Sequence, residues 1–158
     1  DGFNTDLFGY LFGSVAAVSR SDLYIILGIA LFVVLAVIIF YKQLFAISFD
    51  EEYSKVAGLH ARQIHLLFII LTALTISASI RIVGVLLVSA LMTLPVAASI
   101  RIAKSFKQAI FLSILFGEIA VIGGLISGYY FEIPPGGTIV MIAALILVVT
   151  LIIKSKQR

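Results

Sequence analysis

Long apolar runs separated by short polar segments dominate the pattern of this chain. The runs approach the roughly 20 residues that a helix needs to cross a hydrocarbon core of about 30 Å. Backbone in lipid must satisfy its own N–H and C=O groups, and these runs lack the alternation of barrel strands. The pattern therefore predicts an all-α polytopic membrane protein of about five transmembrane helices: Leu23–Tyr41, Ile64–Ile80, Val83–Ser99, Gln108–Phe131 and Thr138–Ile153.

Glycine and proline punctuate these spans. The Pro134–Gly137 run predicts a tight turn between the last two spans, and Pro95 predicts a kink in the third. Small residues allow close helix approach, so the fourth span is expected inside the bundle, given its glycines at 117, 123, 124 and 128. Hydroxyl residues of spans two and three favour helix packing, with a polar pathway wall as the alternative: Thr72, Thr75, Ser77, Ser79, Ser89 and Thr93.

The composition agrees with a membrane protein. Hydrophobic residues make up 62% of the 158 positions and charged residues only 12%, against about 25% charged in soluble domains. There is no cysteine, which excludes disulfides, thiolate metal sites and thiol catalysis. The net charge of +3 resides in short segments between apolar runs, which indicates membrane topology and not nucleic-acid binding.

The basic residues also predict an orientation. With the segment after the first span placed in the cytoplasm, nine of the 11 basic residues lie inside and only Arg20 and Arg81 outside. The inside set is Lys42, Lys55, Arg62, Arg101, Lys104, Lys107, Lys154, Lys156 and Arg158. We therefore expect a cytoplasmic C-terminus and an external N-terminal segment.

The segment Leu44–Arg62 predicts a short cytoplasmic helix. Ser48 and Glu51 form an S-x-x-E capping box, and Asp50 adds negative charge to the first turn. Gly58 is placed to end this helix. One face is apolar and partly aromatic: Phe49, Tyr53, Val56 and Ala57.

Such a helix suits a groove on a cytoplasmic partner. The alternative is an interfacial helix on the lipid headgroups, although helices of that kind normally carry basic residues, whereas three consecutive acids stand here at 50–52.

Few residues are candidates for site chemistry. Glu118 is the one acidic residue inside a span, where an ionisable group is costly. It is either a pathway residue or a protonated group bonded to a neighbouring helix. His60 and His65 are five residues apart, which is not the i, i+4 spacing of a chelating pair, so a surface role is favoured for both.

Four stretches carry a resemblance to a known family. They are DLFGYLFGSVAAVSRSDL (6–23), FDEEYSKVAGL (49–59), RIVGVLLVSALMTLPVAAS (81–99) and GGLISGYYFEIPPGGTIV (123–140). In this order and spacing they resemble the C-terminal half of the ABC-3 permeases of zinc, manganese and iron importers, with the bacterial zinc-uptake permeases looking most similar.

The resemblance implies a multi-pass permease of the bacterial inner membrane that carries a divalent metal ion, with zinc expected. Its implied partners are a second permease subunit forming a homodimer, a cytoplasmic ABC ATPase and an extracytoplasmic metal-binding protein. The segment Phe49–Gly58 would be the coupling helix, which makes Phe49, Asp50, Glu51, Tyr53, Ala57 and Gly58 the expected ATPase contacts. The chain has no phosphate-binding G-x-x-x-x-G-K-[ST] motif, so we expect no enzyme activity and assign ATP hydrolysis to the partner.

The resemblance also implies upstream spans, so residues 1–158 are expected to be the C-terminal part of one permease domain. The family's intramembrane metal contacts would lie in that upstream half. Three other classes stay open: a secondary transporter or channel without an ATPase, an ABC permease for a larger ligand, and a non-transporting scaffold. An associated ATPase would exclude the first and third.

Overall fold

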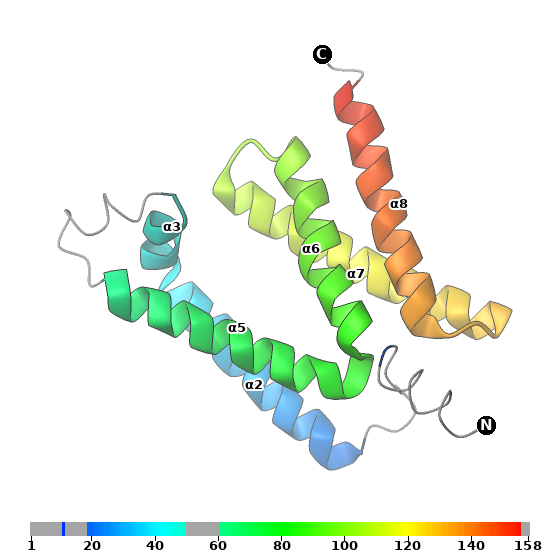
Figure 1. The fold of residues 1–158 in the computed structure, drawn as a ribbon, viewed down its shortest axis with the longest axis horizontal. Coiled ribbons are helices and arrows are strands. Elements are labelled where there is room, and N and C mark those ends of the chain that lie inside the picture. The colour runs from blue at the N-terminus through cyan, green and yellow to red at the C-terminus, as the bar shows by residue number, and fades with distance from the viewer. Residues whose placement is uncertain (1–10, 12–18, 50–60, 156–158) are drawn as a thin grey trace. The chain divides into compact units, whose positions relative to one another are not determined.

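The computed structural model describes residues 11, 19–49 and 61–155 of the chain. The described helices are α2 (Arg20–Ile39), α3 (Tyr41–Phe49), α5 (Ala61–Val83), α6 (Val85–Ile102), α7 (Phe106–Phe131) and α8 (Pro135–Ser155) (Figure 1). Five of them, all but α3, are long and apolar enough to cross a membrane. The predicted all-α fold with about five spans is thus confirmed, with boundaries shifted by a few residues.

The helices belong to two compact units. One contains α2, α3 and α5 up to Ser79, and the other contains α6, α7 and α8. Between α5 and α6 the helix is interrupted at Gly84, whose φ of 80° and ψ of 162° lie in a region open essentially to glycine. Side chains cap two other helix starts. Ser19 and Asp22 form a capping box at α2, and Ser105 accepts from the Gln108 N–H at α7.

The second unit is a three-helix assembly with its own core. Figure 1 shows α6, α7 and α8 together, and each helix contacts the other two. The buried centre is Leu87 of α6, Ala120 of α7, and Ile139 and Ala143 of α8. Two of these four residues are alanines, so the helices approach one another closely.

Glycines bring α7 and α8 together at the end where they connect. A Cβ on Gly124 would lie only 2.6 Å from Ile139 Cα, and one on Gly128 would lie 3.1 Å from Pro135 Cα. Immediately beyond, Glu132 adopts a left-handed φ of 54°, and its N–H and that of Ile133 both donate to the Gly128 carbonyl. The connection therefore closes within the three residues 132–134, and the expected close helix approach is found here. The turn predicted at Pro134–Gly137 is misplaced, because Pro135, Gly136 and Gly137 already form the start of α8.

Hydroxyl groups join the helices of this unit at two places. Ser99 of α6 and Ser113 of α7 share a 2.6 Å hydrogen bond, with Ser99 fully buried. Thr138 of α8 donates to the Gly124 carbonyl of α7 at 2.8 Å and also contacts the Pro135 carbonyl at 2.8 Å. Such bonds between transmembrane helices add specificity to packing that is otherwise dispersive. Pro95 is buried inside α6, which continues through it as one helix.

Candidate functional site

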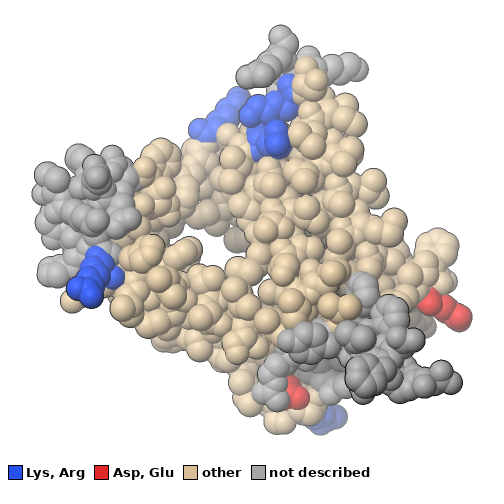
Figure 2. Space-filling view, viewed as in Figure 1, with Lys and Arg blue, Asp and Glu red and all other residues tan. Residues whose placement is uncertain are grey.

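The basic side chains described in the unit of α6–α8 lie at the ends of its spans. In the unit of α6–α8, Arg101 lies in the last turn of α6, Lys104 in the connection to α7, and Lys154 in the last turn of α8. The helix order places all three at one end of that unit, where Figure 2 shows basic side chains gathered. Glu132 lies at the opposite end. Within this unit the basic side chains and Glu132 therefore lie at opposite ends, with Glu118 between them, and the orientation in the membrane stays a prediction.

The aromatic segment that follows α2 is helical from Tyr41 onward. In α3, Tyr41, Phe45 and Phe49 recur every four residues, and their rings form a row with centroids 6.5 Å and 5.0 Å apart. Phe49 ends this helix with 74% of its surface exposed. Sequence reasoning identified Phe49 but missed the two aromatics before it, although the i, i+4 spacing was visible.

The predicted helix start at Ser48 is wrong. Ser48 lies inside α3, and its hydroxyl donates to the Leu44 carbonyl at 2.8 Å. A serine within a helix commonly bonds the carbonyl four residues earlier, and an N-cap has non-helical backbone, so Ser48 cannot be the cap. Of the expected ATPase contacts only Phe49 belongs to the described residues. The others lie outside them: Asp50, Glu51, Tyr53, Ala57 and Gly58.

Glu118 lies on the uncovered face of α7. Its side chain is exposed, whereas Ala120, about 200° away around the helix, is fully buried in the core. No hydrogen bond or ion pair connects Glu118 to another residue within the described ranges. The expected alternative of a Glu bonded to a neighbouring helix is therefore not seen among the described helices.

The described residues contain no metal-binding cluster. No group of three or more His, Asp or Glu side chains comes together within the part of the chain that the structure describes. His65 is exposed on α5, as expected of a surface residue. Metal coordination by this chain is thus not visible in 19–49 and 61–155.

The hydroxyls of spans two and three mostly bond to their own helices. Thr72 and Thr75 donate to carbonyls of α5, and Ser89 and Thr93 donate to carbonyls of α6. The hydroxyls that connect different helices are Ser99, Ser113 and Thr138, which sequence reasoning did not single out. Ser89 and Thr93 are exposed, so they form no part of the packed core of α6–α8.

Comparison with known proteins identifies the family. The model of the ABC 3 transport family matches residues 1–154. The chain belongs to the ABC 3 transport family. This confirms the resemblance drawn from the four sequence stretches, and with the five apolar helices it makes the chain part of a multi-pass membrane protein.

Individual relatives give finer detail. The manganese import system permease protein ScaB of Streptococcus gordonii is 38% identical over 155 residues, 98% of this chain and 56% of ScaB. The high-affinity zinc uptake system membrane protein ZnuB of Haemophilus influenzae is 32% identical over 147 residues, 92% of this chain and 56% of ZnuB. The manganese permease is thus at least as similar, and the expected preference for zinc finds no support in these identities.

A solved structure shares the fold. PsaBC from Streptococcus pneumoniae in complex with Fab contains a chain that superposes with a TM-score of 0.86 at 37% identity, over 93% of this chain and 53% of that one. The chain therefore spans about half the length of the relatives that it matches.

Proposed function

We propose that this chain is part of the membrane-spanning permease subunit of an ATP-driven importer of divalent metal ions, with zinc as the cargo. The observation that carries the proposal is the family match over residues 1–154, together with five helices of membrane-spanning length. In this proposal residues 1–158 form the C-terminal part of one permease domain. The manganese and zinc permeases among the relatives support a divalent metal as cargo.

In this proposal, partner subunits supply ATP hydrolysis, the rest of the translocation path and delivery of the metal ion. A cytoplasmic ABC ATPase hydrolyses ATP, a second permease copy completes the translocation path, and an extracytoplasmic metal-binding protein delivers the ion. The proposal assigns no enzyme activity to this chain and leaves ATP hydrolysis to the partner, because the sequence holds no phosphate-binding loop. The basic ends Arg101, Lys104 and Lys154 face the cytoplasm of a bacterium in this arrangement, because positive residues are retained on that side.

The ATPase contact is proposed at the segment beginning with Phe49. The described part supports it in one respect: α3 ends in a row of aromatic rings with Phe49 exposed at its end. Aromatic side chains that enter grooves commonly contribute 2 kcal/mol or more to binding. The proposed contacts are Phe49, Asp50, Glu51, Tyr53, Ala57 and Gly58.

Substitutions in this segment test the coupling. Phe49→Ala and Tyr53→Ala in the full-length permease should weaken ATPase capture and uncouple hydrolysis from uptake, whereas Glu52→Gln on the acidic rim should change little. ATPase pull-down and metal uptake are measured on the same membranes and normalised to permease abundance. Wild-type values of both in the aromatic variants would remove this segment as the coupling element.

Glu118 is proposed to face the translocation path. An ionisable side chain inside the membrane is stable only beside protein or water, and Glu118 has no partner on the described helices. A hydrated path beside α7 meets this need and gives a carboxylate oxygen to a passing divalent cation.

Transport by the assembled complex tests the function as a whole. The full-length permease with its ATPase and binding protein is placed in vesicles, and uptake of isotopic zinc and manganese is followed with and without ATP. ATP-dependent zinc uptake supports the proposal in full. Uptake of manganese alone supports the second candidate, a manganese importer, which the 38% identity to ScaB favours. Metal uptake that does not depend on ATP would identify a secondary transporter or channel instead.

A further inference from the structure

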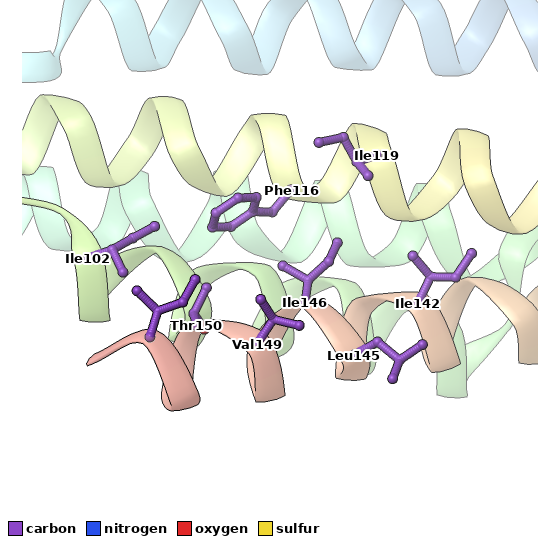
Figure 3. A pocket seen from close by; sticks show the side chains of 9 residues that line it. Ile102, Phe116, Ile119, Ile142, Leu145, Ile146, Val149 and Thr150 are labelled. Carbon is purple, nitrogen blue, oxygen red and sulfur yellow. The ribbon is translucent and has the colours of Figure 1, made fainter. Parts of the chain in front are cut away.

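An apolar groove lies between α7 and α8, with a lining that extends over residues 142–153 of α8 and 116–119 of α7. Phe116 and Ile119 of α7 line one wall, Ile142, Val149 and Ile153 of α8 line the other, and Ile102 at the end of α6 closes one end. Its volume is about 360 Å³. Figure 3 shows Phe116 and Ile119 on one helix facing the side chains of α8 across this space.

The groove follows from how the three helices are joined. The glycine contacts and the three-residue connection hold α7 against α8 at one end. Toward the other end the Ser99–Ser113 hydrogen bond holds α7 against α6 instead. Because α7 packs against α6 at that end, a wedge-shaped space remains between α7 and α8. The groove therefore lies where neither the glycine contacts nor the Ser99–Ser113 hydrogen bond draws α7 against α8.

The groove's lining favours an apolar occupant. Eight of its nine lining residues are apolar, and the ninth, Thr150, already donates its hydroxyl to the Leu147 carbonyl of its own helix. Along α8 the lining extends from Ile142 to Ile153, about 16 Å at 1.5 Å per residue. This matches one leaflet of a hydrocarbon core about 30 Å thick. An acyl chain fits both the length and the polarity.

Basic residues adjoin the residues at one end of the groove. Ile102 and Ile153, which line its end, adjoin Arg101 and Lys154 in the sequence, and Lys104 follows in the α6–α7 connection. All three basic side chains are exposed, and they lie at the end of the unit where basic residues gather in Figure 2. Basic residues at the membrane surface attract anionic lipids, whereas an apolar occupant alone would need none.

We propose that this groove is a binding site for an anionic phospholipid, with one acyl chain between α7 and α8 and the phosphate headgroup held by Arg101 and Lys154. The proposal is independent of which metal is transported and of any ATPase. It assigns to the lipid a structural position in the wedge that protein side chains leave open.

Photo-crosslinking from the groove tests the proposal. An aliphatic diazirine amino acid replaces Leu145, which lines the groove, in the full-length permease. The protein is placed in vesicles of equal parts phosphatidylglycerol and phosphatidylcholine with identical acyl chains. The crosslinked adducts of each lipid are then identified and quantified by mass spectrometry. The same amino acid at Met141, which is exposed on α8 outside the groove, is the positional control.

At position 145 we expect phosphatidylglycerol adducts in clear excess, and at position 141 the two lipids in proportion to the bilayer. Arg101→Gln with Lys154→Gln should lower the phosphatidylglycerol excess by about fivefold or more, since each basic residue near the surface contributes measurably to anionic lipid binding. Lys42→Gln in α3 should leave it unchanged. Val149→Phe should lower the yield of both lipid adducts at position 145 by filling the groove.

Three results would overturn the proposal. Equal yields of the two lipids at position 145 would mean that headgroup charge is not recognised. A phosphatidylglycerol excess that survives the Arg101→Gln and Lys154→Gln changes would place the headgroup elsewhere. Adducts to another helix or a second permease copy would show that protein fills the groove. The glutamine variants leave the core untouched, so the test stands even where Val149→Phe fails to fold.

Discussion

The two units of the molecule bury their helices very differently. In α6–α8 the helices share a core of Leu87, Ala120, Ile139 and Ala143. In the other unit α2 is the most apolar span, yet Ala36 is its one buried residue among those described. The most apolar span is thus the least buried one within the described protein.

The difference shows what holds helices together in lipid. Apolar side chains gain nothing by leaving lipid for protein, so association depends on close packing and hydrogen bonds. The α6–α8 unit has both, in Gly124 and Gly128 and in the hydroxyls of Ser99 and Thr138. By contrast, a Cβ added to Gly28 of α2 would meet nothing within 4 Å.

Gly124→Ala is the variant expected to lose the most stability, and it tests the role of close packing in the α6–α8 unit. The new Cβ would meet the Ile139 backbone, with Cα at 2.6 Å and N at 2.7 Å, so α8 has to move. Overpacking of this kind commonly costs about 1–3 kcal/mol, and we expect a value at the upper end because backbone atoms are involved. The thermal unfolding of the purified full-length permease measures it.

Two further glycines serve as matched controls for this variant. Gly117 of α7 and Gly28 of α2 have open space around them, so Gly117→Ala and Gly28→Ala should be neutral or stabilising by about 0.5–1 kcal/mol. Equal destabilisation at all three positions would mean that the space around a glycine does not decide whether alanine is tolerated there.

Gly84→Ala addresses the break between α5 and α6. The backbone there has φ 80° and ψ 162°, which an L side chain adopts only at a cost of about 1–3 kcal/mol. We expect a lower unfolding temperature in the same assay, with Gly137→Ala as control because that position has space and no positive φ. An unchanged unfolding temperature would show that the two helices can join in another conformation.

Ser99 and Ser113 allow the hydrogen-bond contribution to be measured. A double-mutant cycle with Ser99→Ala and Ser113→Ala should give a coupling of about 0.6 kcal/mol and at most about 1.7 kcal/mol, the range found for bonds between transmembrane helices. The pair Ser89→Ala and Ser113→Ala should show none, since Ser89 bonds within α6. Coupling in the second pair but not the first would contradict the assigned contact.

The smallest effect on stability is expected at Glu118. Its side chain lies away from the packed face of α7, so Glu118→Gln should leave the unfolding temperature nearly unchanged while lowering metal uptake. Glu132→Gln, an exposed acid at the end of the same helix, should leave both near wild type. A large loss of stability in Glu118→Gln with normal uptake would make Glu118 a packing residue.

The sequence predicted the spans well because each depends on a local apolar run. It also predicted close helix approach at Gly124 and Gly128, which the structure confirms, but it included Gly117, around which space is open. The cap at Ser48 failed because a local S-x-x-E signal cannot show that the preceding helix continues through it. Three features depend on how the helices pack against one another, which the sequence of a single segment does not determine. They are the exposure of Glu118, the Ser99–Ser113 hydrogen bond and the groove.

The short connections of α6–α8 have a consequence for biosynthesis. Three residues separate α6 from α7 and another three separate α7 from α8, so consecutive helices of this unit are joined by short connections. Local topology of this kind forms rapidly, and chain segments fold in the order in which they are synthesised. We therefore expect α6 and α7 to enter the bilayer as a hairpin secured by Ser99 and Ser113, with α8 docking against Gly124 when it emerges from the ribosome.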